Sequence, residues 1–304
     1  MLKGKISNAS ILVRVLVWLG IMGVLTLGAM ILWYFLPNRD TMAGTKWLQF
    51  LQTVATFLLP ALAGAYLWSE RPMQWLHLNK GLSWQEALAA VVIMLLALPG
   101  INLLSAWNQQ MSLPEWMSGI EQWMRMQEDA AAQLTEQFLR VDTIGGLLVN
   151  IGLMALLPAM AEELTFRGVV QGMFTRNKHV AIWAAAAIFS FVHFQFYGFL
   201  PRMLLGAMFG YMLWWTGSLW APMLMHFVNN CAAVVLAFWA YNYFEEGSAE
   251  MLDKIGTEDT LLLGVFSICI VVIMMVMYGY LYSHGKGSVK EKEEDNEKDF
   301  ESGI

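Results

Sequence analysis

Long runs without a charged residue recur along the whole chain and are separated by shorter polar segments. A transmembrane helix needs about 20 apolar residues, because the hydrocarbon core of a bilayer is about 30 Å thick. The pattern therefore predicts an all-α polytopic membrane protein, a bundle of about eight transmembrane helices. The predicted spans are Val15–Leu36, Trp47–Trp68, Ala87–Trp107, Gly145–Ala161, Val180–Phe196, Met203–Gly217, Leu219–Tyr243 and Leu261–Tyr282.

Composition supports this class and excludes others. Of the 304 residues, 58% are hydrophobic and only 14% are charged, whereas about a quarter of a soluble domain is charged. The net charge of −6 leaves no basic surface for nucleic acid. Cys231 and Cys269 lie in apolar runs and form no C-x-x-C pair. We therefore expect neither a disulfide framework nor a cysteine metal site.

The placement of charge along the chain predicts the topology. Lys3, Lys5 and Arg14 precede or begin the first span, whereas residues 108–143 and 244–260 form two acidic loops. Because basic loops stay in the cytoplasm, an eight-helix bundle places both termini there. The first apolar run is longer than the core of a signal peptide, so we expect a retained span. Without an organelle signal, the expected location is the bacterial inner membrane.

Two segments outside the spans have their own character. Apolar residues recur at roughly helical spacing from Ile120 to Phe138, which predicts an amphipathic helix on the outer interface. A packing lid is the simpler role for this helix, and a substrate-binding element is the alternative. Residues 285–304 are rich in Lys, Glu and Asp, and we predict a disordered, charged cytoplasmic tail. The remaining residues, 1–284, form a single transmembrane domain.

Polar side chains lie inside three of the predicted spans, where they are costly and usually functional. The fourth, fifth and seventh spans carry them, and the first three carry essentially none. These residues are Glu162, Glu163 and Arg167 in the fourth helix, His193 in the fifth, and His226, Asn229 and Asn230 in the seventh.

Helical geometry divides the charged residues of the fourth helix into two roles. Glu163 and Arg167 are four positions apart, the favourable order for an ion pair within a helix. Such a pair gives structural support, because buried charges are normally paired. Glu162 is about 140° away from Arg167 around an ideal helix and should point elsewhere. A carboxylate that is not neutralised by arginine is available as a general base.

The imidazole and amide groups complete a candidate hydrolytic site. His193 is placed to hold the other side of a water molecule activated by Glu162. His226 and Asn230 are four positions apart on one helix face, as two donors of an oxyanion hole would be. The alternative is that His193 and His226 only pack against neighbouring side chains and take no part in chemistry. Ser190 lies near His193, but no G-x-S-x-G elbow accompanies it. The set favours amide hydrolysis without a covalent nucleophile.

Three motifs occur in order on successive helices: E-E-x-x-x-R from Glu162, F-x-x-x-H from Phe189 and H-x-x-x-N from His226. Together they resemble the CAAX-protease and bacteriocin-processing (CPBP/Abi) family of intramembrane proteases, which includes the Ras-converting CAAX endopeptidase. The resemblance covers about residues 145–243, the expected catalytic core.

The resemblance implies an eight-helix bundle whose active site opens toward the cytoplasm. It implies an intramembrane endopeptidase that acts on a membrane-associated protein or peptide at the lipid bilayer. The alternatives are a non-catalytic bacteriocin immunity or membrane binding protein on the same scaffold, and a transporter. The implied roles are water activation by Glu162 and His193, oxyanion stabilisation by His226 and Asn230, and structural support by Glu163 and Arg167.

The sequence leaves the cofactor open. The helical zinc-protease motif H-E-x-x-H is absent. Glu162, His193 and His226 nevertheless supply two imidazoles and a carboxylate, which match a catalytic zinc site with one open position. A metal-free mechanism needs no further residue, so no cofactor is predicted as certain, and a divalent metal such as zinc stays the alternative.

Overall fold

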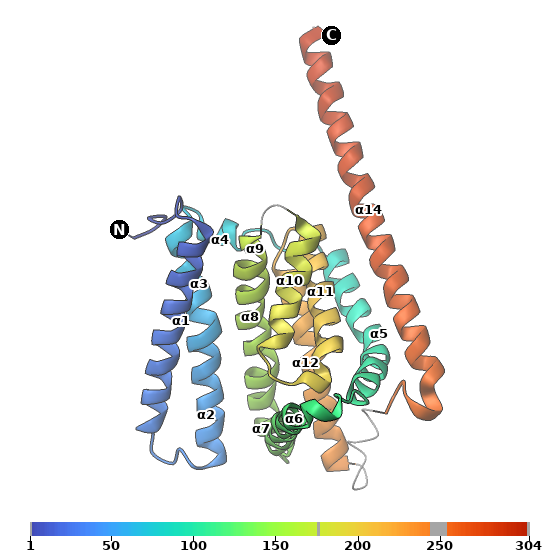
Figure 1. Ribbon diagram of the computed structural model, residues 1–304. Coiled ribbons are helices and arrows are strands. Elements are labelled where there is room, and N and C mark those ends of the chain that lie inside the picture. Colours follow the sequence, from blue (N-terminus) through green and yellow to red (C-terminus); the bar gives the residue numbers. More distant parts are fainter. Residues whose placement is uncertain (1, 175–176, 244–253, 303–304) are drawn as a thin grey trace.

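The computed structural model describes residues 2–174, 177–243 and 254–302, with side chains up to His284 except that of residue 283. All regular structure in these residues is helical (Figure 1). Six helical stretches are long and apolar enough to cross a membrane, which confirms an all-α polytopic membrane protein. They are Ile11–Tyr34, Met42–Trp68, Trp84–Gln109, Ile144–Met173, Trp220–Tyr243 and Glu258–Tyr282.

Several spans are composites of α- and π-helical turns. The second runs through α2 (Met42–Thr53), η1 (Val54–Leu58) and α3 (Leu59–Trp68). The other single helices are α1 (Ile11–Tyr34), α5 (Trp84–Gln109), α12 (Trp220–Tyr243) and α14 (Leu261–Ser302). The fourth span consists of α7 (Ile144–Asn150), η3 (Ile151–Leu156), α8 (Leu157–Glu163), η4 (Leu164–Val170) and α9 (Gln171–Met173).

Two shorter helices of the described residues lie where the fifth and sixth spans were predicted. These are α10 (Lys178–Phe191), an apolar helix of 14 residues, and α11 (Phe199–Thr216), with 18. The prediction that the fifth span continues to Phe196 is wrong. The chain turns after Phe191 because Phe194 has a φ of 55°, in the left-handed region that an α-helix does not use. His193 therefore lies in a turn and not inside a helix.

The predicted amphipathic helix is present as α6 (Ser118–Leu139), which buries Met124 and Phe138. The acidic segment expected at 244–260 lies largely outside the described residues, which resume at Lys254. The backbone of α14 is helical to Ser302, and the disordered tail at residues 285–304 stays a prediction. Glu and Lys are good helix formers, and extending an existing helix avoids the cost of nucleation.

The central helices form the core around the polar residues. One buried cluster joins α3, η4 and α10 through Ala65, Phe166 and Phe189, and a second joins α5, α11 and α12. Hydrogen bonds of Ser267 to the α5 backbone around Pro99 attach α14: its Oγ donates to Leu96 O at 2.5 Å and accepts from Gly100 N at 2.9 Å. These contacts supply partners where proline interrupts the helix.

The bundle has two distinct ends (Figure 1). The N-terminus and the C-terminal end of α14 lie at one end, and α6 lies across the other. The short helix α4 (Pro72–Trp75) and α9 are at the end of the termini. Because α10 runs from there toward α6, the turn that carries His193 lies on the α6 side.

Candidate active site

The helix that carries both glutamates changes its winding at the site. Glu162 and Glu163 end α8, and the following π-helical segment η4 carries Arg167. All seven residues of η4 are buried. Short π-helical stretches are rare and occur frequently at functional sites. The winding of η4 therefore makes this segment a candidate part of the functional site.

The ion pair predicted within this helix is confirmed. Arg167 Nη1 lies 2.7 Å from Glu163 Oε1, and both side chains are fully buried. Arg167 Nη2 also donates to the carbonyl of Gly206 on α11 at 3.2 Å. The guanidinium lies 4.5 Å from the ring centre of Phe189 and 5.2 Å from that of Phe209. The buried cation therefore has a carboxylate, a carbonyl and two aromatic faces as partners.

Glu163 has a further partner that the sequence did not predict. Its Oε1 atom lies 2.8 Å from Nδ1 of His226 on α12, in addition to its contact with Arg167. Its Oε2 atom has no hydrogen-bond partner among the described residues. The carboxylate thus fixes the ring of His226, and it joins η4 to α12 through a buried network.

Glu162 points to the two histidines, away from Arg167, as predicted. Its Oε2 atom lies 3.9 Å from Nε2 of His193 and 3.9 Å from Nε2 of His226. The side chains are 14%, 27% and 7% exposed, respectively. Three chemically active groups, two from helices and one from a turn, therefore surround one partly enclosed point.

The hydrogen bonds on the far side of each ring assign its tautomer. Nδ1 of His193 lies 2.7 Å from the carbonyl of Phe189, which can only accept, so Nδ1 carries the proton. Nδ1 of His226 donates in the same way to the carboxylate of Glu163. In each neutral ring Nε2 is then a free acceptor. Both Nε2 lone pairs are available toward Glu162.

The 3.9 Å separations are too long for direct hydrogen bonds. They match the gap that one water molecule spans when it lies about 2.8 Å from each atom. A water molecule between Glu162 and an imidazole can donate to both acceptors. This arrangement orients the water and increases the electron density on its oxygen, as nucleophilic attack requires.

The same three groups fit a metal ion poorly in this arrangement. Zinc bound at about 2.0–2.1 Å in tetrahedral geometry brings its donor atoms to about 3.4 Å from one another. The 3.9 Å separations from Glu162 to both rings are wider. Among the described residues, no group of three His, Cys, Asp or Glu side chains has metal-binding geometry.

Asn230 lies beside the histidines and is held in a fixed orientation. Its Nδ2 atom donates to the carbonyl of Met154 at 3.2 Å, and its Oδ1 atom accepts from Nδ2 of Asn229 at 3.0 Å. The side-chain amide has two N–H groups, of which the Met154 bond uses one. Asn229 therefore orients this amide.

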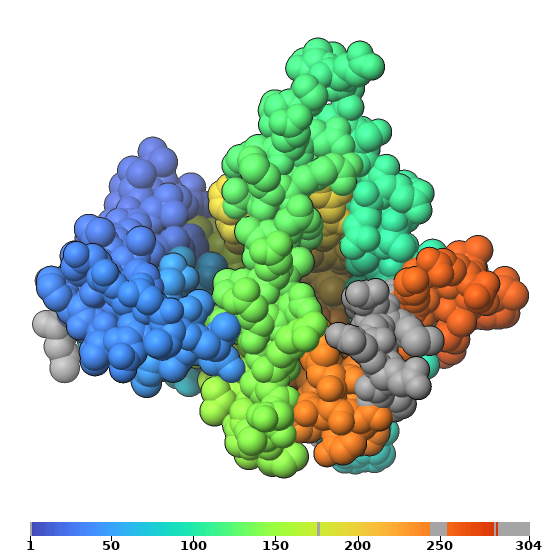
Figure 2. Space-filling view, turned by 90° about the horizontal axis from the view of Figure 1, so that it is seen from below, coloured from blue at the N-terminus to red at the C-terminus, as the bar shows by residue number. Residues whose placement is uncertain are grey.

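A cavity of about 360 Å³ contains the site. Glu162, His193, His226 and Asn230 all line it, so the four predicted catalytic residues converge. Seen from the α6 end, the molecule is hollowed between α6 and α5, and deeper segments are visible there (Figure 2). The remaining lining residues are Ile101, Ser105, Met154, Pro158, Phe189, Gly198, Pro201, Arg202, Leu205, Phe209 and Asn229.

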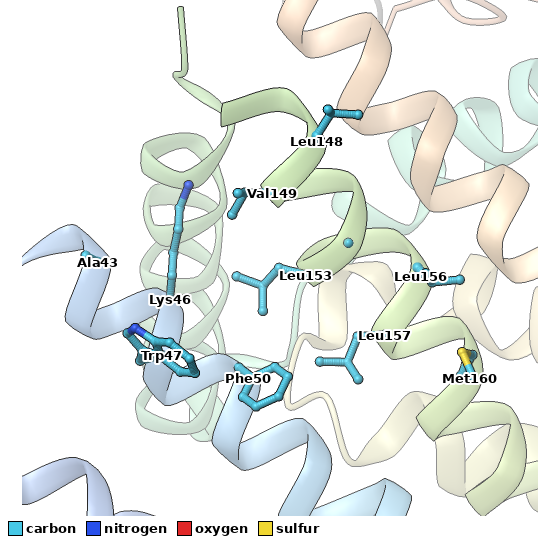
Figure 3. A pocket seen from close by; sticks show the side chains of 11 residues that line it. Ala43, Lys46, Trp47, Phe50, Leu148, Val149, Leu153, Leu156, Leu157 and Met160 are labelled. Atoms are coloured by element: carbon cyan, nitrogen blue, oxygen red, sulfur yellow. The ribbon is translucent and has the colours of Figure 1, made fainter. Parts of the chain in front are cut away.

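A second cavity, of about 620 Å³, is larger but carries no comparable chemistry (Figure 3). It is a groove between α2 and the α7–η3–α8 segment, lined mainly by apolar side chains such as Phe50, Leu153 and Leu157. Lys46 is its charged residue, and the amine donates to Asn150 Oδ1 at 2.7 Å. None of the predicted catalytic residues lines this groove.

Two residues whose positioning roles the sequence did not predict hold the turn of His193. Asn108, at the end of α5, donates to the carbonyl of Phe196 at 3.1 Å and accepts from the amide of Leu200 at 2.7 Å. Ser190 donates to the carbonyl of Phe199 at 2.7 Å. Their partners are distant or lie across a turn, so no local sequence pattern predicts them.

Helix α6 packs on the same turn. The ring of Trp123 lies 6.5 Å from that of Phe194 and 5.9 Å from that of Phe196. Glu128 Oε2 accepts from the amide of Tyr197 at 3.2 Å, and burial raises the pKa of this carboxyl group. The role of α6 as a packing element is therefore the one its contacts support.

The position of α6 bears on the orientation of the site. The turn of His193 packs on α6, at the end opposite the two termini. His226 lies in the second turn of α12, whose first residue, Trp220, donates to the carbonyl of Leu78 near α4, at the end of the termini. The resemblance implied a site open to the cytoplasm, and charge placement implied cytoplasmic termini. Because the site residues lie between the two ends of the bundle, both expectations stay predictions.

Comparisons with known proteins concern the segment that forms the site. Residues 144–232 match the model of the Rce1-like family, described as type II CAAX prenyl endopeptidase Rce1-like. A stretch of 83 residues is 36% identical to the uncharacterized protein YpbD of Bacillus subtilis (strain 168). This stretch covers 26% of the chain and 41% of YpbD, so the chain spans about two fifths of that relative. No solved structure is a significant match.

The family match confirms the resemblance that the three motifs indicated. The matched segment, less than a third of the chain, contains all six residues of those motifs that the sequence singled out for catalysis or support. It supports a CAAX-protease-like character at the level of the family. The helices before residue 144 lie outside the match.

Proposed function

We propose that this protein is an intramembrane endopeptidase that hydrolyses peptide bonds of membrane-associated proteins or peptides. The observation that carries the proposal is the convergence of Glu162 Oε2 on the Nε2 atoms of His193 and His226, at 3.9 Å from each. Helices long and apolar enough to span a membrane line this cavity. The Rce1-like match of residues 144–232 favours peptide hydrolysis over other reactions that use an activated water.

In the proposed reaction, Glu162 takes a proton from the water held between it and His193. The water oxygen attacks the carbonyl carbon of the substrate and forms a tetrahedral intermediate. Glu162 then gives its proton to the leaving amine as the carbon–nitrogen bond breaks. A carboxylate positioned within hydrogen-bond reach of the water contributes about 10²–10⁴-fold to such a step.

The oxyanion of the intermediate needs donors that are already in place. Asn230 supplies the N–H that is not used by Met154. His226 donates from Nε2 only when its ring carries a second proton, since its Nδ1 proton is bonded to Glu163. In its neutral state His226 instead accepts from the water. Glu163 and Arg167 support the site by fixing this ring.

The proposed mechanism requires no cofactor. If zinc takes part, His193, His226 and Glu162 are the residues that would hold it, after a closer approach than the structure shows. The family description names a prenyl endopeptidase, and prenylated substrates are a property of that family. For this chain the proposal extends to membrane-associated peptides and proteins, without a prenyl group as a requirement.

The full-length chain, purified into nanodiscs and offered a library of quenched fluorescent peptides, tests this function. We expect cleavage by the wild type, and a loss of about 10²–10⁴-fold in kcat/KM for Glu162→Gln. Glu136→Gln, which changes an exposed carboxylate of α6, is the matched control and should cleave normally. Full activity of folded Glu162→Gln would overturn the mechanism. A cellular phenotype that survives this substitution would indicate a non-catalytic immunity or binding role.

A further inference from the structure

The cavity contains a cation that the proposed mechanism does not use. Arg202 lies in the first turn of α11 and lines the same cavity as Glu162, His193 and Asn230. Its Nη1 atom donates to the carbonyl of Gln195 at 3.2 Å, and its Nη2 atom donates to Oε1 of the same residue at 2.8 Å. Of the five N–H donors of a guanidinium, these bonds use two.

Arg202 differs from the buried arginine of the site in its partners. No carboxylate lies within 4.0 Å of Arg202 in the part of the chain that the structure describes, whereas Arg167 has Glu163 at 2.7 Å. Charges inside transmembrane bundles are normally paired, or they mark the path of a ligand. A half-buried guanidinium whose two bonds go to a neutral side chain and a carbonyl retains its capacity to bind an anion.

The surroundings of Arg202 hold the guanidinium in place. Gln195 binds it from the turn that also carries His193. Gly198 faces it closely, because a Cβ atom at that position would lie 3.1 Å from Arg202 Nη2. Because glycine has no side chain, the guanidinium of Arg202 can occupy this space. An arginine fixed in this way loses little rotamer freedom on binding a ligand, and its planar fork suits a carboxylate.

The size and chemistry of the cavity restrict the ligand. About 360 Å³ is near the lower end of the range of ligand pockets, about 300–1,000 Å³. The cavity holds Glu162 as a base, two imidazoles and Arg202 as a cation. A short peptide segment with a carboxylate matches this set, because its anion pairs with Arg202 while a carbonyl approaches the water site.

We propose that Arg202 is a specificity-determining residue that binds a carboxylate of the peptide substrate and so sets the position of the cleaved bond. This inference rests on the proposed peptidase function, since it assigns the substrate class of the same cavity. The carboxylate belongs either to the C-terminus of the substrate or to an Asp or Glu side chain, and the test separates these sources.

The test measures binding to the full-length Glu162→Gln protein in nanodiscs, so that no cleavage is needed. Three fluorescent hexapeptide mixtures serve as probes. The first has a free C-terminal carboxylate and no acidic side chain, the second has a C-terminal amide and no acidic side chain, and the third has a C-terminal amide and one Asp. We expect the first or the third mixture to bind at least about tenfold more tightly than the second, as a charge-assisted hydrogen bond implies.

Adding Arg202→Gln should reduce this preference to within about twofold, and Arg202→Lys should retain part of it, because lysine keeps the charge without the fork. Arg140→Gln, at an exposed arginine, is the matched control and should keep the full preference. If Arg202→Gln does not fold, Gln195→Ala replaces it, because it releases the guanidinium and should weaken the preference.

Three results would overturn the proposal: equal binding of all three mixtures, a preference that persists in Arg202→Gln, or no binding of any mixture at millimolar concentration. Failure of the peptidase function is distinguishable. A carboxylate preference in a chain that cleaves no peptide would leave the role of Arg202 standing and overturn the enzyme. Cleavage without a carboxylate preference would support the enzyme and overturn the role of Arg202.

Discussion

The Nε2 atom of His193 lies 3.9 Å from the Oε2 atom of Glu162, although one residue belongs to a turn after α10 and the other to the end of α8. Two contacts fix this relationship. The carbonyl of Phe189 holds the far nitrogen of the ring, and Asn108 holds the chain just beyond the turn. The free lone pair of His193 therefore faces a carboxylate across the width of one water molecule.

His193→Ala should reduce kcat/KM by about 10²-fold or more, because it removes one of the two acceptors that orient the water. Its melting temperature should change little, since the ring is 27% exposed. His179→Ala, which removes an exposed imidazole at the start of α10, is the matched control and should retain activity. Equal activities of the two variants in a peptide cleavage assay would remove His193 from the mechanism.

Arg167→Met should destabilise the protein by about 3–5 kcal/mol, because it leaves the carboxylate of Glu163 buried without its cation. Adding Glu163→Gln should recover part of this loss, since the double variant has no unpaired charge. Thermal unfolding in a mild detergent measures both effects.

Arg140→Gln is the control for this comparison, because it breaks an exposed ion pair with Glu136, a change of under about 1 kcal/mol. If the double variant is as unstable as Arg167→Met, the interaction between Glu163 and Arg167 does not account for the loss.

Purified protein should contain well below one zinc ion per chain, and a chelator should leave peptide cleavage unchanged. The reason is the 3.9 Å spacing of Glu162 from both imidazoles, which exceeds that of zinc-bound donors. Elemental analysis and an assay after dialysis against chelator measure this. One zinc per chain that disappears in His193→Ala would establish a zinc enzyme.

The end of the bundle that carries α6 should face away from the cytoplasm, because Lys3, Lys5 and Arg14 lie at the end of the termini and basic segments stay inside. A membrane-impermeant thiol reagent tests this on intact bacterial cells, in a background that lacks Cys231 and Cys269. Gln127→Cys on α6 should be labelled, and Asn8→Cys should be labelled only after lysis.

This topology has a direct consequence for the turn that carries His193. The turn and helix α6, which packs on it, would face the extracytoplasmic side. The reverse labelling pattern would place this turn toward the cytoplasm and would show that charge placement does not govern the orientation of this chain.

Much of the architecture followed from local patterns. Uncharged runs of about 20 residues have few alternatives to membrane-spanning helices, so the bundle could be predicted without knowledge of any contact. The ion pair of Glu163 and Arg167 could be predicted in the same way, because both residues lie one turn apart on a single helix. The end of α10 could not, since the left-handed Phe194 carries no proline or glycine signal.

The sequence by itself determined which chemical groups enter the membrane and in what order, because a charged or amide side chain within an apolar run is visible in the chain alone. Only the tertiary structure decided how these groups meet. Helical rise gives depth along one helix but not the relative heights of two, and these heights depend on packing between helices. Packing brought the Nε2 atoms of His193 and His226 to equal distances from Glu162 Oε2. It also brought Nδ1 of His226 into contact with the carboxylate of Glu163, and it placed Arg202 in the same cavity.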